Sequence, residues 1–189
     1  MLEPLAWRVI SHEPGHDYRI FETRWVAAAH PTTGEIRRFV VLDATDWVNV
    51  IALTRDDHVV LIRQFRIGAE SVFLEIPGGM VDPGEAPADA AARELLEETG
   101  YGARTWRPLG VVRPNPAIQG NRLHTYLALD AEQVAPPTPE GGEVITVETR
   151  ALGEIAALLR DGSIDHALVV AAFAHLMLAT GGALARPPA

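Results

Sequence analysis

The sequence predicts an α/β fold in which helices cover both faces of a mixed sheet. Apolar, β-rich segments of strand length recur along most of the chain, and short clusters rich in glycine, proline or aspartate separate them. An acidic helical segment interrupts the strands near the middle, and two apolar helical segments follow near the end. Strands mixed with three helices in this order are typical of an α/β/α sandwich.

The first 45 residues predict an antiparallel β subdomain of three strands. Two breakers separate these strands, His12–Gly15 and Pro31–Gly34, and the second is typical of a hairpin turn. The expected strands are Trp7–Ile10, Arg19–Ala29 and Glu35–Leu42.

Residues 46–181 predict the main domain, and residues 182–189 a flexible tail. The turn Arg55–Asp57 joins the first two strands of this domain, and Ser163 is a suitable N-cap for its last helix. The expected strands are Val48–Thr54, His58–Phe65, Ser71–Glu75, Trp106–Val112, Arg122–Leu129 and Glu143–Glu148. The expected helices are Pro87–Thr99, Ala151–Arg160 and Ile164–Thr180.

Composition and charge exclude several classes of protein. The 189 residues contain no cysteine, which excludes disulfides, thiolate zinc sites and cysteine nucleophiles and fits a cytoplasmic protein. The net charge of −9 argues against a nonspecific nucleic-acid binder, which needs a basic face, but not against a nucleotide enzyme with bound metal ions. Met1–His12 lacks a signal-peptide pattern, and the longest apolar run, Ala167–Ala179, is too short to cross a bilayer, so we expect no membrane partner.

The expected helix Pro87–Thr99 carries the strongest chemical signal. Glu97 and Glu98 follow Glu94 by three and four residues, so three carboxylates lie on or beside one helix face. Like charges four residues apart repel, and Arg93 satisfies only part of this charge by reaching Glu97 one turn on. A hard divalent cation, Mg²⁺ or Mn²⁺, would balance the remaining negative charge. Such a cation binds carboxylate oxygens and keeps water ligands that a phosphate-bearing substrate can replace.

The alternative is a solvated helix face, and the residues before the helix argue against it. Ile76–Gly79 follows a strand-like run and turns sharply, and its glycines let the backbone approach a ligand closely. Pro87 lies where a first helical turn tolerates proline. A strand, a glycine loop and an acidic helix together form a platform for a metal-bound pyrophosphate.

The stretch Gly79–Tyr101 resembles the Nudix box, G-x5-E-x7-R-E-U-x-E-E-x-G-U, in which U is an apolar residue. The pattern fixes seven identities over 23 residues, and Tyr101, aromatic where the family more often has an aliphatic residue, is the one mild departure. The matching residues are Gly79, Glu85, Arg93, Glu94, Leu95, Glu97, Glu98 and Gly100. The resemblance implies a Nudix-type α/β/α sandwich over about Trp47–Thr180 and a metal-dependent hydrolase of a nucleoside diphosphate linked to another group.

Segments outside the box look like the ADP-ribose pyrophosphatase group of this family. They are the N-terminal strands, Val60–Arg66, Leu74–Gly79, Asp161–Asp165 and Pro116, which lies sixteen residues after Gly100. Pro114–Arg122 departs from the Ser-Pro-Gly version that is usual in the group. The resemblance therefore implies hydrolysis of the pyrophosphate bond of ADP-ribose or a related nucleoside diphosphate sugar, giving a nucleoside monophosphate and a sugar phosphate.

The resemblance also implies which residues do the chemistry. The metal ligands are the Gly79 carbonyl, Glu94, Glu97 and Glu98, with Arg93 beside them at the catalytic centre. The general base comes from a loop distant from the box, and here the loop before the late strand offers Glu140 and Glu143. Alignment with the family's late strand favours Glu143, although either glutamate fits a solvated loop charge equally well.

Five further residues are candidates for substrate binding. Arg63 and Arg66 suit phosphate oxygens, but their spacing of three does not place them on one strand face, so we expect at most one to point at the substrate. A surface arginine is the alternative for each of them, and for Arg122. Glu75 either binds a ligand of the site directly or supports a residue that does. The alternative is that it forms an ion pair with Arg93. Pro116 enters through the resemblance alone.

The resemblance finally implies a nucleotide-sugar substrate and a homodimer, in which the N-terminal strands contribute to the partner subunit's nucleotide pocket. Two alternatives remain open. One is a hydrolase of another nucleoside diphosphate derivative, such as a dinucleoside polyphosphate. The other is a nucleotide-sensing module without turnover, against which the intact set Arg93, Glu94, Glu97 and Glu98 speaks, because a sensor does not need costly adjacent carboxylates.

Overall fold

The structure is a computed structural model that describes residues 5–139 and 141–187. Within this range the chain forms two compact units. Unit 1 contains the residues up to Thr45 together with Arg113–Arg122, and unit 2 contains Asp46–Val112 and the residues from Leu123 onward. The segment Arg113–Arg122, which the sequence left in the main domain, joins unit 1 because the Leu42 amide donates to the Ile118 carbonyl at 2.8 Å.

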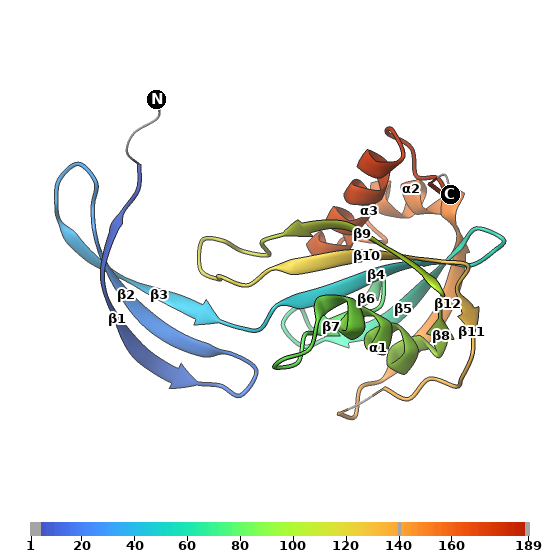
Figure 1. The fold of residues 1–189 in the computed structure, drawn as a ribbon, viewed down its shortest axis with the longest axis horizontal. Coiled ribbons are helices and arrows are strands. Elements are labelled where there is room, and N and C mark those ends of the chain that lie inside the picture. Colours follow the sequence, from blue (N-terminus) through green and yellow to red (C-terminus); the bar gives the residue numbers. More distant parts are fainter. Residues whose placement is uncertain (1–4, 140, 188–189) are drawn as a thin grey trace. The chain divides into compact units, whose positions relative to one another are not determined.

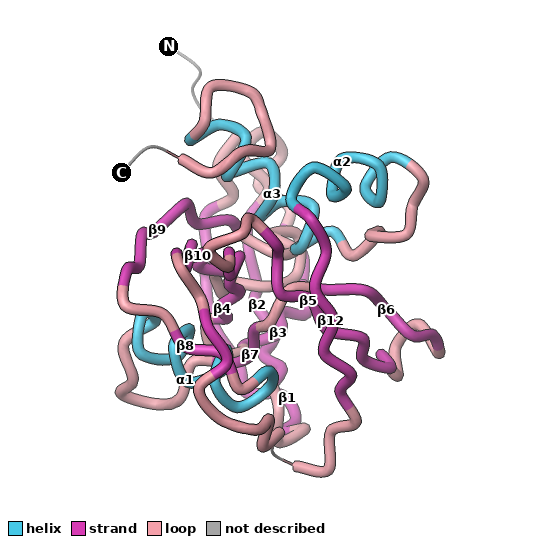
Figure 2. Tube along the Cα trace, turned by 90° about the vertical axis from the view of Figure 1, so that its right-hand side faces the viewer, coloured by secondary structure: helices cyan, strands magenta, loops and turns pink. Residues whose placement is uncertain are grey.

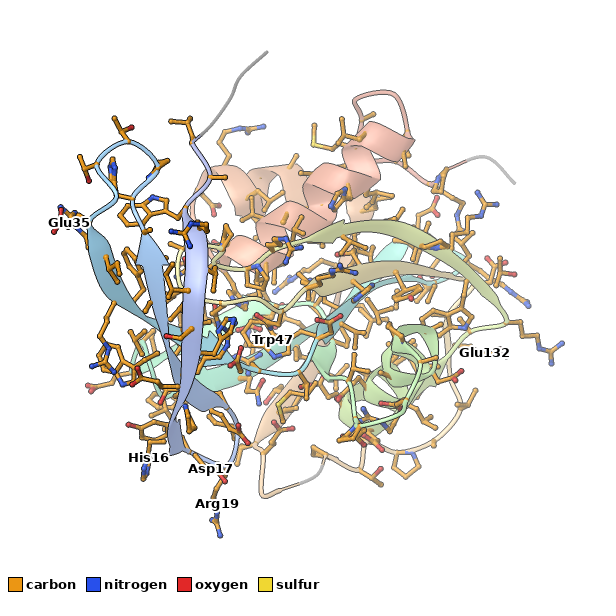
Figure 3. The ribbon with its side chains drawn as sticks, turned by 60° about the vertical axis from the view of Figure 1, so that its left-hand side comes forward. His16, Asp17, Arg19, Glu35, Trp47 and Glu132 are labelled. Atoms are coloured by element: carbon orange, nitrogen blue, oxygen red, sulfur yellow. The ribbon has the colours of Figure 1, made fainter. Side chains whose placement is uncertain are left out.

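Unit 1 is the antiparallel sheet that the sequence predicts, in the order β1-β2-β3 (blue strands in Figure 1). Its strands are β1 (Arg8–Asp17), β2 (Glu22–Ala29) and β3 (Ile36–Asp43). Figure 3 shows Glu35 at one end of this sheet and His16, Asp17 and Arg19 at the other.

One boundary in unit 1 was predicted wrongly. Strand β1 runs through His12–Gly15, which we interpreted as a breaker. Proline is tolerated there because β1 is an edge strand, so the missing Pro14 N–H need not leave a ladder bond unmade. Gly15 lies directly against Thr23 of β2, where a side chain would not fit.

Unit 2 is built on a mixed sheet in the order β12-β5-β4-β10-β9, with β6 paired to β5 and β7 paired to β4. Strand β10 is parallel to β4, and the other pairs in this sheet are antiparallel. The strands are β4 (Trp47–Leu53), β5 (His58–Arg66), β6 (Ser71–Glu75), β7 (Gly78–Met80), β9 (Thr105–Val112), β10 (Leu123–Leu129) and β12 (Ile145–Ala151). Two short strands form a separate ladder, β8 (Tyr101–Gly102) and β11 (Glu132–Gln133), and neither they nor β7 were predicted.

Three helices accompany this sheet, α1 (Pro87–Thr99), α2 (Leu152–Arg160) and α3 (Ala167–Ala179). Helix α1 has the predicted bounds. Helix α3 begins later than predicted, because Ser163 bonds through its amide to the Asp161 side chain in a turn. Ile164 is buried in the core before the helix starts, and His166 takes the N-cap position.

Alternating residues of the central strands fill two cores. On one face, Val48, Val50 and Ala52 of β4 pack with Ala91 and Leu95 of α1. On the other face, Ile51 and Leu53 pack with Ile155 of α2 and Phe173 and Leu176 of α3. Figure 2 shows α1 on one side of these strands and α2 and α3 on the other. The α/β/α sandwich is therefore confirmed.

The segment after α3 is held more firmly than the predicted tail. Leu184 packs against the core, and Arg186 forms ion pairs with Asp57 and Asp130. Contacts thus continue close to the end of the described chain, and only residues 188–189 of the predicted tail lie outside it. Across the described residues, no helix combines the length and apolar character needed to cross a bilayer.

Candidate active site

Helix α1 packs its small apolar residues on the sheet and directs Glu94 and Glu98 toward Gly78 and Gly79 of β7. Pro87 starts the helix, where its missing N–H loses nothing, and Gly100 ends it in the left-handed conformation with φ 73°. Ala90, Ala91 and Leu95 are fully buried. These contacts fix the rotation of the helix about its axis, and with it the direction of the glutamates.

Arg93 is the centre of an ion-pair network around the first turns of α1. Its Nε and Nη2 donate to the two oxygens of Glu85, each at 3.0 Å. Its Nη1 donates to Glu94 at 2.9 Å and to Glu97 at 3.1 Å, so the Arg93–Glu97 contact that we predicted is present. Nη2 also donates to the Met80 carbonyl at 3.0 Å. Arg93 therefore ties the loop before the helix to the carboxylates on it.

Gly79 leaves room for the Glu94 carboxyl group. A Cβ on Gly79 would lie less than 3.0 Å from all three atoms of that carboxyl. Gly79 lies on β7, opposite Val48 of β4. Burial raises the pKa of Glu94, although the adjacent Arg93 lowers it in part. The glycine of the motif is thus explained by close approach to an acidic side chain.

Glu98 is the most deeply buried of the helix carboxylates, with 3% of its surface exposed. Its Oε2 accepts the Gly78 amide at 2.8 Å. This single hydrogen bond does not offset the loss of solvent, so burial raises the pKa of Glu98 to about 8, and the charges of Glu94 and Glu143 add to the effect. Without a cation this carboxyl group is therefore mostly protonated at neutral pH, and a bound cation would favour its ionised form.

The residues present fit a divalent cation on two observations. Glu98 is buried and accepts the Gly78 amide as its one hydrogen bond among the described residues, and Gly79 keeps the space beside Glu94 free of a side chain. The donor set consists of hard oxygen atoms, as Mg²⁺ and Mn²⁺ require. Within residues 5–139 and 141–187, no three histidine or acidic side chains already form a metal-binding cluster. Arg93 occupies oxygens of Glu94 and Glu97 instead.

Glu75, at the end of β6, is held by two partners that the sequence did not indicate. Arg66 of β5 donates to both of its oxygens, Nε to Oε1 at 2.9 Å and Nη2 to Oε2 at 2.7 Å. His166 places Nδ1 3.2 Å from Oε2, a close contact without the alignment of a hydrogen bond. Burial alone would raise the pKa of Glu75, but Arg66 and His166 lower it to about 2. The Glu75–Arg93 ion pair that we considered is wrong, because both residues have other partners.

The two candidate arginines of β5 point to opposite faces of the sheet. Arg63 donates to Glu148 at 2.7 Å, and Glu148 lies opposite Leu61, whose side chain is in the core beneath α2 and α3. Arg66, in contrast, shares a strand face with Val60, whose side chain is in the core beneath α1. Of the two, only Arg66 therefore lies on the face that carries α1.

Glu143 lies within electrostatic range of the acidic helix. It accepts a hydrogen bond from Gln64 of β5 at 3.1 Å, and its charge contributes to the raised pKa of both Glu94 and Glu98. Its side chain is exposed. Glu140, the other candidate base, lies outside the described residues.

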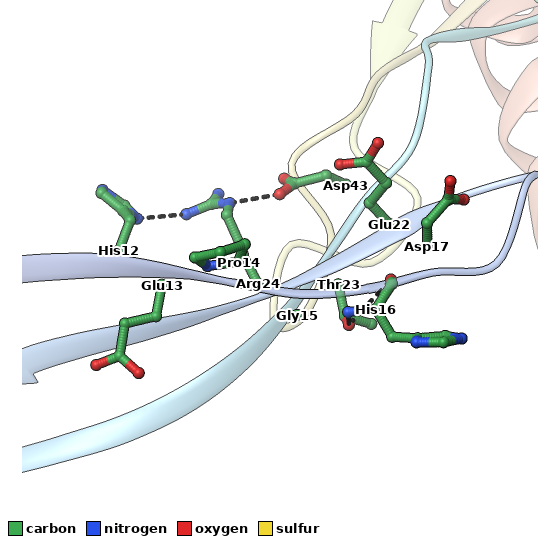
Figure 4. Close-up of a pocket in the computed structure, with 10 residues that line it drawn as sticks. All are labelled: His12, Glu13, Pro14, Gly15, His16, Asp17, Glu22, Thr23, Arg24 and Asp43. Carbon is green, nitrogen blue, oxygen red and sulfur yellow. Dashed lines mark hydrogen bonds and ion pairs between the residues drawn. The ribbon is translucent and has the colours of Figure 1, made fainter.

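The remaining candidates belong to unit 1. Pro116 and Arg122 lie in the segment Arg113–Arg122, and their part in the site stays a prediction. Unit 1 also has an open hollow, in which Arg24 donates to Asp43 at 2.6 Å and lies 2.8 Å from the His12 ring (Figure 4). This hollow contains none of the residues of the acidic helix, and its arginine is already paired. It is therefore not the candidate active site.

Two contributing residues were missed by the sequence analysis, Gln64 and His166. Gln64 hydrogen-bonds Glu143 from 79 positions away, and His166 contacts Glu75 across the intervening strands and helices. Neither residue belongs to a local motif. The pairing of β5 with β12 brings Gln64 to Glu143, and the packing of α3 on the sheet brings His166 to Glu75.

Comparison with known proteins finds hydrolases of ADP compounds among the relatives of this chain. Residues 45–173 match the model of the NUDIX domain. The chain is 38% identical over 88 residues to "ADP compounds hydrolase NudE" from Escherichia coli, with 47% of this chain and 46% of that protein covered. It is 29% identical over 184 residues to an ADP-ribose pyrophosphatase from Mycobacterium tuberculosis, with 96% and 88% covered. A crystal structure of an ADP compounds hydrolase matches with a TM-score of 0.82 and 26% identity, covering 93% and 95% of the two chains.

These matches differ in extent. The alignment with NudE spans about half of that protein, whereas the alignment with the solved structure covers both chains almost completely. The family model covers more than half of this chain and includes Gly79, Arg93 and the glutamates of α1. Motif, fold and sequence comparison agree, and the chain belongs to the Nudix family.

Proposed function

We propose that this protein hydrolyses the pyrophosphate bond of ADP-ribose or a related nucleoside diphosphate sugar, releasing a nucleoside monophosphate and a sugar phosphate. The observation that carries the proposal is the carboxyl pair beside the Gly78–Gly79 strand: Glu98 is buried on the Gly78 amide, and Glu94 lies against Gly79. The relatives that are named for ADP-ribose or for ADP compounds support this substrate class.

Nudix hydrolases generally need a divalent metal ion, and we propose Mg²⁺ or Mn²⁺ for this chain. Glu94, Glu97, Glu98 and the Gly79 carbonyl would hold it. A bound metal ion neutralises the diphosphate and lowers the pKa of a coordinated water. Arg93 orients Glu94 and Glu97 through its Nη1 contacts, so the ligands are positioned before substrate arrives.

Two residues on the α1 face complete the proposed chemistry. The Glu143 carboxylate takes a proton from the attacking water, and its bond to Gln64 fixes where this base stands. Arg66 uses one edge of its guanidinium for Glu75, which leaves Nη1 for a phosphate oxygen of the substrate. Because the Arg66 side chain is 39% exposed, a substrate can reach it.

We further propose that the protein is a cytoplasmic homodimer. Unit 1 exposes several large apolar side chains on its three-stranded sheet, and exposed apolar patches mark interaction surfaces. They include Ile10, Trp25, Ile36, Phe39 and Val40. Light scattering of the full chain tests the proposal, and a mass equal to one chain contradicts it.

A metal-dependent activity screen tests the proposed function. ADP-ribose, ADP-glucose, GDP-mannose, UDP-glucose and diadenosine polyphosphates are each incubated with the protein in Mg²⁺ and, in parallel, in EDTA, and the products are separated. We expect AMP and ribose 5-phosphate from ADP-ribose in Mg²⁺ and no products in EDTA. Turnover confined to the diadenosine compounds would replace the nucleotide-sugar assignment, and no turnover on any compound would leave a binding module.

A further inference from the structure

The unit 2 sheet has already separated where Arg66 and Glu75 meet. Strand β4 pairs with β5 only between Leu53 and Val59. Beyond that pair, β5 continues along β6, and the start of β4 is paired with β7. Helix α3 packs on the face of the sheet opposite α1. Its N-cap residue nevertheless reaches Glu75, because the two halves of the sheet have parted there.

His166 lies against Oε2 of Glu75, the oxygen that also accepts Arg66 Nη2. The imidazole lies edge-on to Phe73, with ring centroids 6.2 Å apart, and its Nδ1 is 3.2 Å from Glu75 Oε2. Nδ1 is shielded from solvent and has no hydrogen-bond partner among the described residues. A buried ring nitrogen without a partner costs free energy. The contact with the buried Glu75 carboxylate therefore accounts for the position of the His166 ring.

Arg66 needs such a support because other charges attract it. The carboxylates of Glu98 and Glu143 both act on the Arg66 guanidinium. Without a firm hold on Glu75, the side chain can turn toward them and occupy oxygens that a metal ion and the attacking water need. The two hydrogen bonds to Glu75 prevent this only as long as Glu75 itself keeps its rotamer.

We propose that His166 is a positioning residue for the hydrolysis, acting through Glu75 to hold Arg66 where it meets a substrate phosphate. The proposal rests on the proposed function and adds to it a residue from α3, outside the Nudix box. His166 does not contact the reacting atoms. It sets the place of the arginine that does.

The test is a double-mutant cycle on ADP-ribose hydrolysis with His166→Ala, Arg66→Ala and the pair. Loss of a residue that supports a ligand-binding side chain lowers kcat/KM about tenfold to a hundredfold, and we expect most of the loss in KM for His166→Ala. The double variant should be no worse than Arg66→Ala alone, because both changes remove the same contact. His166→Asn, which keeps a donor near the position of Nδ1, should recover most of the loss.

The matched control is His58→Ala, which removes a similar histidine–carboxylate contact, 3.0 Å to Asp56, at the other end of β5. It should leave both kinetic constants unchanged. If His166→Ala does not fold, Glu75→Gln takes its place in the cycle. Additive losses in the cycle, or an unchanged kcat/KM in His166→Ala, overturn the role of His166 and leave the proposed function intact.

Failure of the proposed function itself has a different signature. If the native protein hydrolyses no nucleoside diphosphate sugar, the role of His166 is decided by calorimetric titration with inorganic pyrophosphate. Affinity that is about tenfold weaker in both His166→Ala and Arg66→Ala supports it. Equal affinity in native protein and His166→Ala overturns it.

Discussion

The end of helix α1 and the end of strand β6 each bury one glutamate to nearly the same extent, with 3% of Glu98 and 2% of Glu75 exposed. Their environments act in opposite directions. Glu98 accepts one backbone amide, and burial raises its pKa to about 8. Glu75 accepts both edge nitrogens of Arg66 and lies against His166, which together lower its pKa to about 2 although burial works against them.

The difference separates two uses of a buried carboxylate. At Glu75 the protein supplies the counter-charge itself, so the group is part of the folded structure. At Glu98 it does not, and the group is ready for a cation from outside. Substitutions in the first region should therefore lower stability most, and substitutions in the second should lower activity most.

Glu98→Gln should produce the largest effect. We expect kcat to fall by about 10⁴-fold, because several kcal/mol of metal-dependent stabilisation of the transition state are lost. The free energy of unfolding in EDTA at pH 7 should stay about the same, because a carboxyl group with a pKa of about 8 is mostly protonated there and glutamine is its neutral isostere. Steady-state kinetics and urea denaturation measure the two quantities. Undiminished turnover would remove Glu98 from the metal site.

Glu143→Gln tests whether the exposed Glu143 carboxylate is the general base of the reaction. Loss of a general base lowers kcat by about 10³-fold, and the affinity for Mg²⁺ should hardly change. Glu140→Gln is the matched control two glycines away, and we expect it to keep near-native kcat. The opposite result in the pair of variants would assign the base to Glu140.

The contrast between the regions also explains what the sequence could predict. The α1 network is local: Arg93, Glu94 and Glu97 lie within one turn, and helix periodicity alone brings them together. Glu75, Arg66 and His166 come from β6, β5 and the start of α3. Strand pairing brings Arg66 near Glu75, and the packing of α3 on the sheet brings His166 there. Their meeting has no periodic signature, so the sequence led to the wrong partner for Glu75.

The ends of the strands and helices show the same division between local and distant causes. Ser71–Glu75 and Pro87–Thr99 were predicted to the residue, since breakers and a proline mark their ends. The start of α3 was not, because Ile164 is drawn into a core built from other segments. Strand β1 was predicted too short. An edge strand tolerates Pro14, but whether a strand lies at the edge depends on the whole sheet and cannot be read from the local sequence.

Gly79→Ala perturbs the Glu98 region without removing a charge. The added methyl group would displace the Glu94 carboxyl, and a shift of about 1 Å in a catalytic group can cost about 10²-fold in rate. Gly153→Ala on α2 is the control, because a Cβ there meets nothing within 4 Å. We expect lower kcat in the first variant, with unchanged thermal midpoints in both. Native kinetics in Gly79→Ala would show that Glu94 can move without consequence.

Glu75→Gln completes the comparison by testing stability as a function of pH. The folded-state pKa of about 2 lies below the ordinary value of 4.5, so the ionised group stabilises the native protein at neutral pH. That contribution is fully present above about pH 5 and declines as pH falls from 4.5 toward 2. Because Arg66 is partly exposed, we expect no more than about 2 kcal/mol at pH 7. Urea denaturation of both proteins between pH 3 and 7 measures the gap, and a gap that stays constant across this range would mean that the ionised form of Glu75 is not what holds Arg66.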